Sequence, residues 1–296
     1  MLRVALMNVA RGYTENLVFQ IIKSMVDVEI TTPRNAQLII KGPYKEKNKF
    51  AKYKNKLVSK NAVVLFDSAE NTRYGDVKAD YYITHDLGVS DPRHIRIPHW
   101  YNVIDWRHKG LPELGETKRF GRSISIDELM APRSINSFID REEAAVIFAG
   151  HLREPRGSII EAIKKQMKVV GYGRAFDAEI LNHNNSGIQK QDILKKYKFN
   201  ICPENSLGIG YYTEKVVEAY AAGCIPIYWS DHNVSHDFNE KSFINASNHV
   251  TQHNYNFPNL TEIKIQQNII SYPLINEEPR IEKLLLFLDK IIKKCK

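Results

Sequence analysis

The chain has 296 residues, of which 43% are hydrophobic and 26% charged, the composition of an ordinary globular protein. This composition excludes a disordered tail, a collagen and a coiled-coil rod, and the length suits two domains of about 150 residues or one large α/β unit. The 42 Lys and Arg residues against 34 Asp and Glu give a net charge of +8, which fits nucleic acid, anionic lipid or a nucleotide as a partner, or simple solubility.

The first hundred residues alternate the patterns of strands and helices. The apolar run Leu2–Val9 predicts a first strand, and Glu15–Val26 predicts a helix because its apolar residues recur on one face. Apolar runs between turn residues predict three further buried strands, at Gln37–Lys41, Ala62–Phe66 and Tyr81–Thr84. This alternation favours a parallel sheet built from βαβ units.

The pattern then weakens and starts again. Residues 105–143 are polar, aperiodic and interrupted by Gly and Pro, so we place the inter-domain region there. Further strands are predicted at Ala144–Gly150, Val169–Tyr172, Phe199–Cys202 and Ile225–Trp229. Helices are predicted at Ser158–Met167, Asp192–Tyr197 and Glu214–Ala222. We therefore expect an α/β fold with two domains, residues 1–140 and 141–280, that face a central cleft at the carboxyl ends of their strands.

The densest chemistry lies in residues 197–230. The predicted strand Phe199–Cys202 runs into a polar loop with two glycines, which allow a ligand to approach the backbone closely. A helix then begins at Thr213, a residue type favoured at the N-cap, and Lys215 lies in its first turn. Free N–H groups beside an ammonium group form an anion site that suits a diphosphate. The alternative is a simple turn in which Glu214 and Lys215 are a solvated pair.

This segment resembles the donor-binding signature of the α-1,3/4-fucosyltransferases, glycosyltransferase family 10, and the bacterial members most of all. The resemblance rests on Glu204-Asn205-Ser206, on Gly210-Tyr211-Tyr212-Thr213-Glu214-Lys215 and on Ile225-Pro226-Ile227. It is strong over about residues 145–250 and weaker in the N-terminal half. It implies the GT-B architecture of two Rossmann-like domains, with the acceptor side in the first and the nucleotide-sugar site in the second.

The resemblance also implies a reaction, the inverting transfer of L-fucose from GDP-fucose to a hydroxyl of a glycan acceptor. The acceptor would be N-acetylglucosamine or glucose in lipopolysaccharide or another surface glycan, linked α-1,3. Two alternatives stay open: the same fold with another GDP-sugar as donor, and a non-catalytic protein that binds polyanions through its net positive charge.

Six residues of the second domain receive a donor-binding role from the resemblance. The resemblance implies an enzyme that requires no cofactor and for which a divalent metal would at most be stimulatory, and the absence of an Asp-x-Asp triplet from the sequence agrees with this. Protein cations would instead stabilise the leaving GDP, with Arg174 and Lys215 on the diphosphate. Glu214 would accept hydrogen bonds from hydroxyls of fucose or ribose. The remaining residues of this pocket would be Asn205, Tyr211 and Thr213. Tyr211 could equally be a core aromatic, and Arg174 a surface residue at a strand end.

An inverting transfer needs a carboxylate that takes the proton of the acceptor hydroxyl, and the resemblance assigns this role to Glu70. Glu70 follows the predicted strand Ala62–Phe66, at whose carboxyl end a ligand would bind. Asp67 is the rival base, although its position favours a turn former. Three further candidates lie on the acceptor side: Asn71, Trp100 and Tyr101. The two rings would stack on a sugar, and the alternative is that they pack at a strand end.

Two basic stretches remain. Lys41–Lys60 holds eight lysines and predicts a solvated helix and loop, with single-stranded nucleic acid or anionic lipid as alternative partners. We expect no nucleic-acid partner. In Ile281–Lys296 apolar residues recur at helical spacing with lysines on the other side. This tail predicts a basic amphipathic helix over residues 281–296 that either packs on the domain core or binds an anionic membrane surface.

The sequence predicts a cytoplasmic location, either free or peripheral on the inner face of the cytoplasmic membrane. No apolar run approaches the roughly 20 residues that a membrane span needs, and the first apolar stretch is too short for a secretory signal. The three cysteines form neither a zinc pattern nor a disulfide framework, which fits a reducing compartment.

Overall fold

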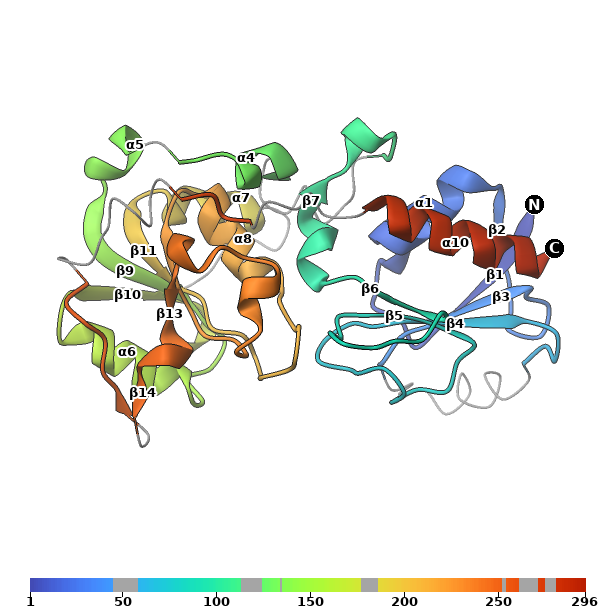
Figure 1. The fold of residues 1–296 in the computed structure, drawn as a ribbon, viewed down its shortest axis with the longest axis horizontal. Helices are drawn as coiled ribbons and strands as arrows, with labels where there is room; N and C mark the ends of the chain where they lie inside the picture. Colours follow the sequence, from blue (N-terminus) through green and yellow to red (C-terminus); the bar gives the residue numbers. More distant parts are fainter. Residues whose placement is uncertain are drawn as a thin grey trace. The chain divides into compact units, whose positions relative to one another are not determined.

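The protein divides into two compact units in a computed structural model (Figure 1). The structure describes residues 1–44, 58–112, 124–133, 135–176, 186–251, 254–260, 271–274 and 281–296. Unit 1 comprises Met1–Asn102, Trp106–Gly115 and Pro279–Lys296, and unit 2 comprises Val103–Asp105 and Glu116–Glu278. The main division therefore falls near residue 115, whereas the sequence analysis places it at residue 140. The chain also returns to unit 1 for its last residues.

Unit 1 is built on a six-stranded sheet with the strand order β2-β1-β3-β4-β5-β6, in which every pair is parallel. Its strands are β1 (Leu2–Met7), β2 (Val28–Ile30), β3 (Leu38–Lys41), β4 (Val63–Asp67), β5 (Tyr81–Thr84) and β6 (His94–Arg96). All four residues of β5 are buried, as expected for a parallel strand covered on both faces. The four strands predicted in this half are confirmed, with ends that shift by at most two residues.

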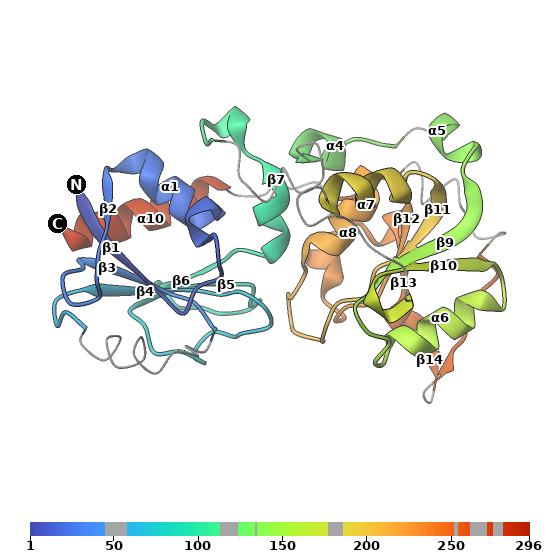
Figure 2. The same cartoon turned by 180° about the vertical axis from the view of Figure 1, so that it is seen from behind.

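Two helices, α1 (Leu17–Met25) and α10 (Ile281–Cys295), lie side by side on one face of this sheet (Figures 1 and 2). Asn16 caps α1, because its Oδ1 accepts a hydrogen bond from the Val18 N–H at 2.9 Å. The 3₁₀ helices of unit 1 are η1 (Tyr13–Glu15), η2 (His99–Val103) and η3 (Arg107–Lys109).

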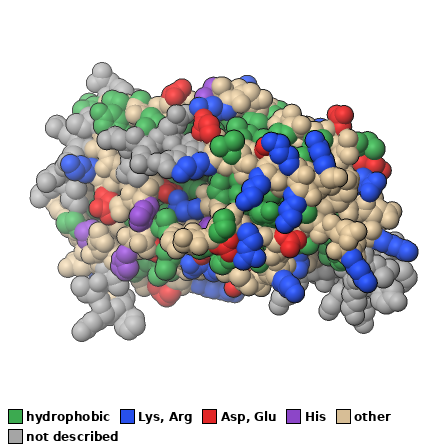
Figure 3. Space-filling model, turned by 45° about the vertical axis from the view of Figure 1, so that its right-hand side comes forward, with side chains coloured by type: hydrophobic (Ala, Val, Ile, Leu, Met, Phe, Trp, Pro, Cys, Tyr) green, Lys and Arg blue, Asp and Glu red, His purple; other side chains and the backbone are tan. Residues whose placement is uncertain are grey.

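The apolar face of α10 is buried within unit 1, with Leu284, Leu288 and Ile291 fully covered. Phe287 contacts the ring of Tyr81 on β5, with 5.8 Å between centroids. Of the two expectations for the tail, packing on the domain core is the one that the structure shows. On the face seen in Figure 3, Lys and Arg side chains are spread among hydrophobic and acidic ones. Among the described residues, no helix is long and apolar enough to cross a membrane.

Unit 2 is built on a five-stranded parallel sheet with the order β10-β9-β11-β12-β13. Its strands are β9 (Glu142–Phe148), β10 (Lys168–Tyr172), β11 (Tyr197–Ile201), β12 (Ile225–Tyr228) and β13 (Ile244–Asn245). Helix α6 (Arg156–Lys164) lies on one face, and α7 (Ser186–Leu194) and α8 (Glu214–Ala221) lie on the other (Figures 1 and 2). The apolar core of unit 2 includes Ile147, Phe199 and Ile227 from the central strands, which are at most 1% exposed.

Smaller elements complete unit 2. The short strands are β7 (Ile104–Asp105), β8 (Ile124–Ser125), β14 (Val250–Thr251) and β15 (Asn254–Tyr255). The short helices are α4 (Ile126–Met130), α5 (Asn136–Ile139), η4 (Arg174–Phe176), η5 (Val234–His236), η6 (Glu240–Ser242) and η7 (Ala246–His249). Both large sheets are parallel, so each unit gathers the carboxyl ends of its strands along one edge, where open α/β sheets bind ligands.

Candidate functional site

The buried carboxylate of Glu204 organises the loop that follows β11 in unit 2. Its side chain is fully buried and accepts hydrogen bonds from Thr213 N at 2.8 Å and from Thr213 Oγ1 at 2.8 and 3.0 Å. Tyr228 OH donates to it at 2.7 Å, and Lys215 Nζ lies 3.1 Å away. A buried carboxylate is stable only with such partners. Glu204 therefore fixes the start of α8, a role that the sequence analysis did not assign.

Lys215 is held at the rim of this network. Its Nζ donates to Glu204 Oε2 at 3.1 Å and to Thr213 Oγ1 at 2.8 Å, and the side chain remains 19% exposed. Burial lowers the pKa of Lys215, but the charges of Glu204 and Glu214 outweigh burial and raise it well above its usual range. The ammonium group is thus positioned, charged and accessible to an anion. Glu214 lies beside it, with 3.9 Å between Nζ and Oε1 and 24% of its side chain exposed.

Two predicted donor-binding residues are buried. Tyr211 is 2% exposed, so the core position that the sequence analysis left open is the one it occupies. Thr213 is the N-cap residue of α8, as predicted, but its hydroxyl makes no capping bond and faces Glu204. Both residues are therefore buried at or directly before the start of α8.

Arg174 lies at the carboxyl end of β10, in η4, and is exposed. Gly173 before it has φ of +111°, and a Cβ there would lie 2.3 Å from the carbonyl oxygen of Ala149. Only glycine allows this close approach. The turn brings Arg174 beside the loop after β9, where its Nε donates to Gly150 O at 3.4 Å. This position agrees with the expected cation at a strand end.

A second arginine, which the sequence analysis did not select, lies beside this loop. Arg156, the first residue of α6, is 6% exposed. Its Nη2 donates to Asn205 Oδ1 at 2.7 Å, and its Nη1 lies 3.2 Å from both ring nitrogens of His151. Burial lowers the pKa of Arg156, and the charge of Glu204 offsets part of this effect. The carboxyl edge of the unit 2 sheet thus carries Arg156, Arg174 and Lys215 as cations.

Glu70 lies in unit 1, on the turn that follows β4, as predicted. The residue is exposed and adopts the left-handed region with φ of +55°, which is uncommon for a residue with a side chain. His99 Nε2 donates to its carbonyl oxygen at 3.0 Å and holds this turn. The ring of His99 packs against the fully buried ring of His85, with 5.2 Å between the two ring centroids. Burial is the main cause that lowers the pKa of His85 to about 3, which keeps it neutral.

Asp67, the rival base, is buried at the end of β4 and is 7% exposed. Tyr13 OH donates a hydrogen bond to its carboxylate. Burial raises the pKa of Asp67 to about 7, and the bond from Tyr13 opposes this shift. Of the two carboxylates, Glu70 is therefore the one that solvent, and hence a bound alcohol, can reach.

Trp100 and Tyr101, expected on the acceptor side, lie in the packed position that the sequence analysis gave as the alternative. Trp100 is 2% exposed and Tyr101 is 8% exposed, and their rings contact each other with 4.5 Å between centroids. Trp106 packs against Tyr101 and donates from Nε1 to its carbonyl oxygen at 2.9 Å. The rings thus form a packed strand end and leave little face for a sugar. Asn71 directly follows Glu70 and is half-buried.

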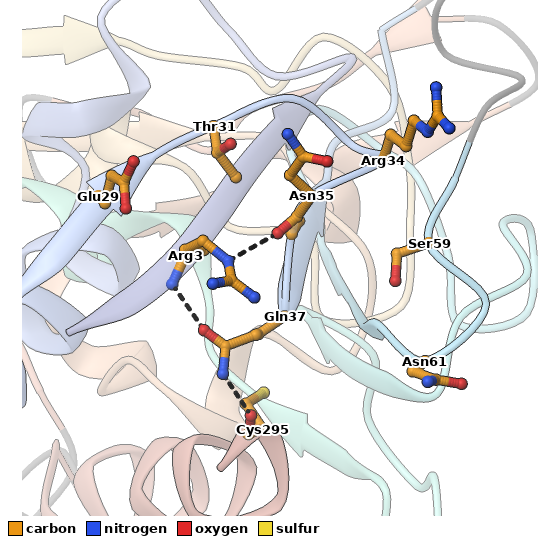
Figure 4. Close-up of a pocket in the computed structure, with 10 residues that line it drawn as sticks. Arg3, Glu29, Thr31, Arg34, Asn35, Gln37, Ser59, Asn61 and Cys295 are labelled. Carbon is orange, nitrogen blue, oxygen red and sulfur yellow. Dashed lines mark hydrogen bonds between the residues drawn. The ribbon is translucent and has the colours of Figure 1, made fainter.

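A polar hollow of about 610 Å³ lies at the opposite edge of the unit 1 sheet (Figure 4). Arg3, Gln37 and Asn61, at or near the amino ends of their strands, are part of its lining. Gln37 accepts from Arg3 N–H at 3.1 Å and donates to Cys295 O at 3.0 Å, which ties the end of α10 to the sheet. The hollow contains none of the predicted site residues.

The described residues contain no group of three or more His, Cys, Asp or Glu side chains that could hold a metal ion. The lysine-rich stretch of residues 45–57 lies outside the described residues, so its expected helix and loop stay a prediction.

Comparison with known proteins places this arrangement in context. Residues 140–260 match the family described as "Glycosyltransferase family 10 (fucosyltransferase) C-term". The alpha-(1,3)-fucosyltransferase FucT of Helicobacter pylori is 29% identical over 201 residues, which are 63% of this chain and 41% of that protein. The chain thus spans less than half the length of this relative.

Two solved structures have a similar fold over nearly the whole chain. A crystal structure of an alpha1,3-fucosyltransferase has a TM-score of 0.70 at 20% identity and covers 99% of this chain and 90% of its own. A structure of an alpha1,3-fucosyltransferase with GDP-fucose has a TM-score of 0.70 at 22% identity, with the same coverage. This similarity confirms the α/β fold class, with its parallel sheets in the GT-B fold.

Proposed function

We propose that the protein transfers L-fucose from GDP-fucose to a hydroxyl of a glycan acceptor, and the match of residues 140–260 to glycosyltransferase family 10 is the premise of this proposal. The observation that carries the proposal is the set of cations at the carboxyl edge of the unit 2 sheet. Lys215 is anchored there by the buried Glu204, and Arg156 and Arg174 follow β9 and β10. One relative of known structure binds GDP-fucose, which supports the same donor here.

In this proposal the cations stabilise the charge that builds up on the leaving GDP. Only the part of the interaction that strengthens in the transition state raises the rate. A guanidinium can grip phosphate oxygens with two N–H groups, and the ammonium of Lys215 adds a point charge. Glu214, a quarter exposed beside Lys215, accepts hydrogen bonds from hydroxyls of the donor sugar or ribose.

Glu70 is the general base of the proposed reaction. Its carboxylate takes the proton of the acceptor hydroxyl as the oxygen attacks the anomeric carbon of fucose, the bond to the diphosphate breaks, and the configuration inverts. The exposure of Glu70 and the fixed turn at its backbone support this role. We propose N-acetylglucosamine or glucose of a surface glycan as the acceptor and an α-1,3 linkage.

A donor screen tests the proposal first. Thermal unfolding is followed with GDP-fucose, GDP-mannose and UDP-sugars, and we expect GDP-fucose to stabilise the protein by mass action more than the others do. Equal stabilisation by GDP-mannose would favour the same fold with another GDP-sugar. Stabilisation by none of the nucleotide sugars would contradict the proposal.

The second test separates chemistry from binding. We expect Glu70→Gln to lower the turnover of GDP-fucose with a glycan acceptor by about 10²–10⁴-fold and to leave GDP affinity unchanged. Glu29→Gln is the matched control, because Glu29 is exposed on β2 of the same sheet. A Glu70→Gln variant with full turnover would exclude this residue as the base.

A further inference from the structure

Three neighbouring strands of unit 1, β4, β5 and β6 (Figure 1), lead into one chain of contacts at their carboxyl ends. Glu70 follows β4, His85 directly follows β5, and Arg96 ends β6, three residues before His99. Arg96 Nε donates to the carbonyl oxygen of His85 at 3.1 Å. The ring of His85 packs against that of His99, and His99 Nε2 donates to the carbonyl oxygen of Glu70 at 3.0 Å. The backbone of the proposed base is thus tied to the next two strands of the sheet.

The backbone of His99 is fixed on both sides. Before it, the Ile97 N–H donates to the carbonyl oxygen of Thr84 at 2.8 Å, which extends the pairing of β5 with β6. After it, Trp100 and Tyr101 are buried in the core of unit 1. The imidazole of His99 therefore extends from a backbone that cannot shift without disturbing the sheet or these rings.

The backbone of Glu70, by contrast, has a conformation that depends on its surroundings. Its φ of +55° lies in the left-handed region, which costs free energy for a residue with a Cβ and persists where other contacts impose it. Ser68 Oγ donates to Thr72 O at 2.8 Å and closes the same turn independently of His99. Without the bond from His99 the turn would stay closed, but Glu70 at its centre could relax to another backbone region and its side chain would point elsewhere.

We propose that His99 is a positioning residue for Glu70, whose hydrogen bond holds the left-handed backbone that directs the carboxylate toward the acceptor hydroxyl. This inference rests on the proposed function, in which Glu70 is the general base. A base contributes only when it lies within hydrogen-bond reach of the proton that it takes. Loss of His99 therefore slows the chemical step. It leaves nucleotide binding unchanged, because both residues lie in unit 1 and the proposed donor-site residues lie in unit 2.

Steady-state kinetics of the full chain with GDP-fucose and an N-acetylglucosamine-containing glycan test the proposal. His99→Leu keeps an apolar side chain of similar size but has no hydrogen-bond donor. We expect kcat to fall about tenfold, while KM for GDP-fucose and the calorimetric affinity for GDP stay within about twofold. His108→Leu is the matched control with native kcat, because His108 is exposed on the neighbouring helix η3. A native kcat in His99→Leu overturns the proposal.

His99→Gln separates the hydrogen bond from the shape of the ring. The amide nitrogen of Gln can donate to the same carbonyl oxygen, so we expect this variant to keep kcat within about threefold of the native value. A loss in His99→Gln equal to that in His99→Leu means that the donor group is not what acts, and it overturns the proposal. Thermal unfolding without ligand confirms that each variant is folded.

The double variant decides whether His99 acts through Glu70. If it does, His99→Leu with Glu70→Gln turns over GDP-fucose no more slowly than Glu70→Gln alone, because residues that act as a unit are non-additive. Full additivity means that His99 acts without Glu70 and overturns the positioning role.

The same measurements distinguish a failure of this inference from a failure of the proposed function. A native protein that neither binds GDP nor turns over GDP-fucose contradicts the proposed function, and full turnover by Glu70→Gln contradicts the assignment of the base. Native kcat in His99→Leu, together with slow turnover by Glu70→Gln, contradicts the role of His99 alone.

Discussion

At the scale of single residues, the carboxylate of Glu204 holds together the start of α8. It accepts from a backbone N–H, two hydroxyls and the ammonium of Lys215 while it is fully buried. In Glu204→Gln the amide cannot accept all these bonds, and Lys215 loses its counter-charge. We expect a loss of about 3 kcal/mol in the free energy of unfolding, measured by urea denaturation.

The same change alters Lys215. Because the charge of Glu204 contributes to the raised pKa of Lys215, Glu204→Gln should lower that pKa. The loss of the contacts by which Glu204 positions Thr213 and Lys215 should weaken GDP binding. Glu161→Gln is the matched control, since Glu161 pairs with Lys164 on the surface with 68% of its side chain exposed. Surface pairs contribute little, so its urea midpoint should not change measurably. Equal midpoints for the two variants would show that Glu204 is not the organising group.

Asp67 gives a prediction about pH. Its pKa is about 7 in the folded protein, because of burial, and about 3.9 in an unfolded chain. The folded state therefore binds the proton more tightly, so stability is fully present below pH 4 and is lost as pH rises through 7. From pH 5 to pH 8 the loss due to this group should be about 2–3 kcal/mol.

Asp67→Asn removes this titration while it keeps the shape of the side chain. Urea denaturation at pH 5 and pH 8 should give a smaller difference in the free energy of unfolding for Asp67→Asn than for the native protein. Asp27→Asn, at an exposed position in the same unit, should retain the native difference. If Asp67→Asn retains it as well, Asp67 is not the group that titrates.

The sequence predicts individual site residues only where a local pattern carries them. Lys215 and Glu214 lie in one motif at a helix start, and Glu70 follows a strand. Their places in the fold can therefore be predicted from the neighbouring residues in the sequence. The partner of Asn205 is 49 residues away, and Tyr228 reaches Glu204 across 24 residues. Such contacts depend on how strands are ordered in the sheet, which no local pattern specifies. The sequence left open whether Trp100 and Tyr101 pack or face a ligand for the same reason, because burial depends on tertiary packing.

At the scale of elements, two substitutions in α10 test whether this helix is part of the folded core of unit 1. Leu288 is fully buried, whereas Leu286 on the same helix is 72% exposed. We expect Leu288→Ala to cost about 2–5 kcal/mol in the free energy of unfolding, because it leaves a cavity, and Leu286→Ala to cost less than about 0.5 kcal/mol. Urea denaturation of the two variants measures the difference.

If α10 were a membrane anchor, Leu288→Ala would affect membrane binding and not the free energy of unfolding. If the apolar face of α10 were available to lipid, Leu288→Ala would leave stability unchanged and reduce flotation with anionic liposomes. With that face packed on α1 and β4, we expect its stability to fall and flotation to stay the same. The amphipathic pattern predicted this helix correctly but could not choose its partner, because a core and a bilayer both accept an apolar face.

The strands that the sequence predicts are the buried ones, and the edge strands are missed. Runs of buried residues such as Tyr81–Thr84 were identified to the residue, since a strand covered on both faces is continuously apolar. The edge strands β2 and β6 were missed because they have three residues each and are at most half-buried. An edge strand is defined by its hydrogen bonds to a neighbour, and these leave no apolar run to recognise.

At the scale of the whole molecule, two units with separate sheets and cores can unfold in separate steps. The proposed donor-site residues all lie in unit 2, whereas Leu288 lies in unit 1. By mass action, GDP at 100 times its Kd should stabilise the unit that binds it by about 2.7 kcal/mol. Calorimetry should therefore show one transition that GDP raises and another that Leu288→Ala lowers.

The combination of ligand and variant identifies each transition without further assumptions. In Leu288→Ala with GDP, the two transitions should move apart, because the ligand acts on unit 2 and the cavity on unit 1. A single transition that responds to both changes would mean that the units unfold together. A transition raised by GDP and also lowered by Leu288→Ala, beside one that neither affects, would place the nucleotide on unit 1 and contradict a donor site built on Lys215 and Arg174.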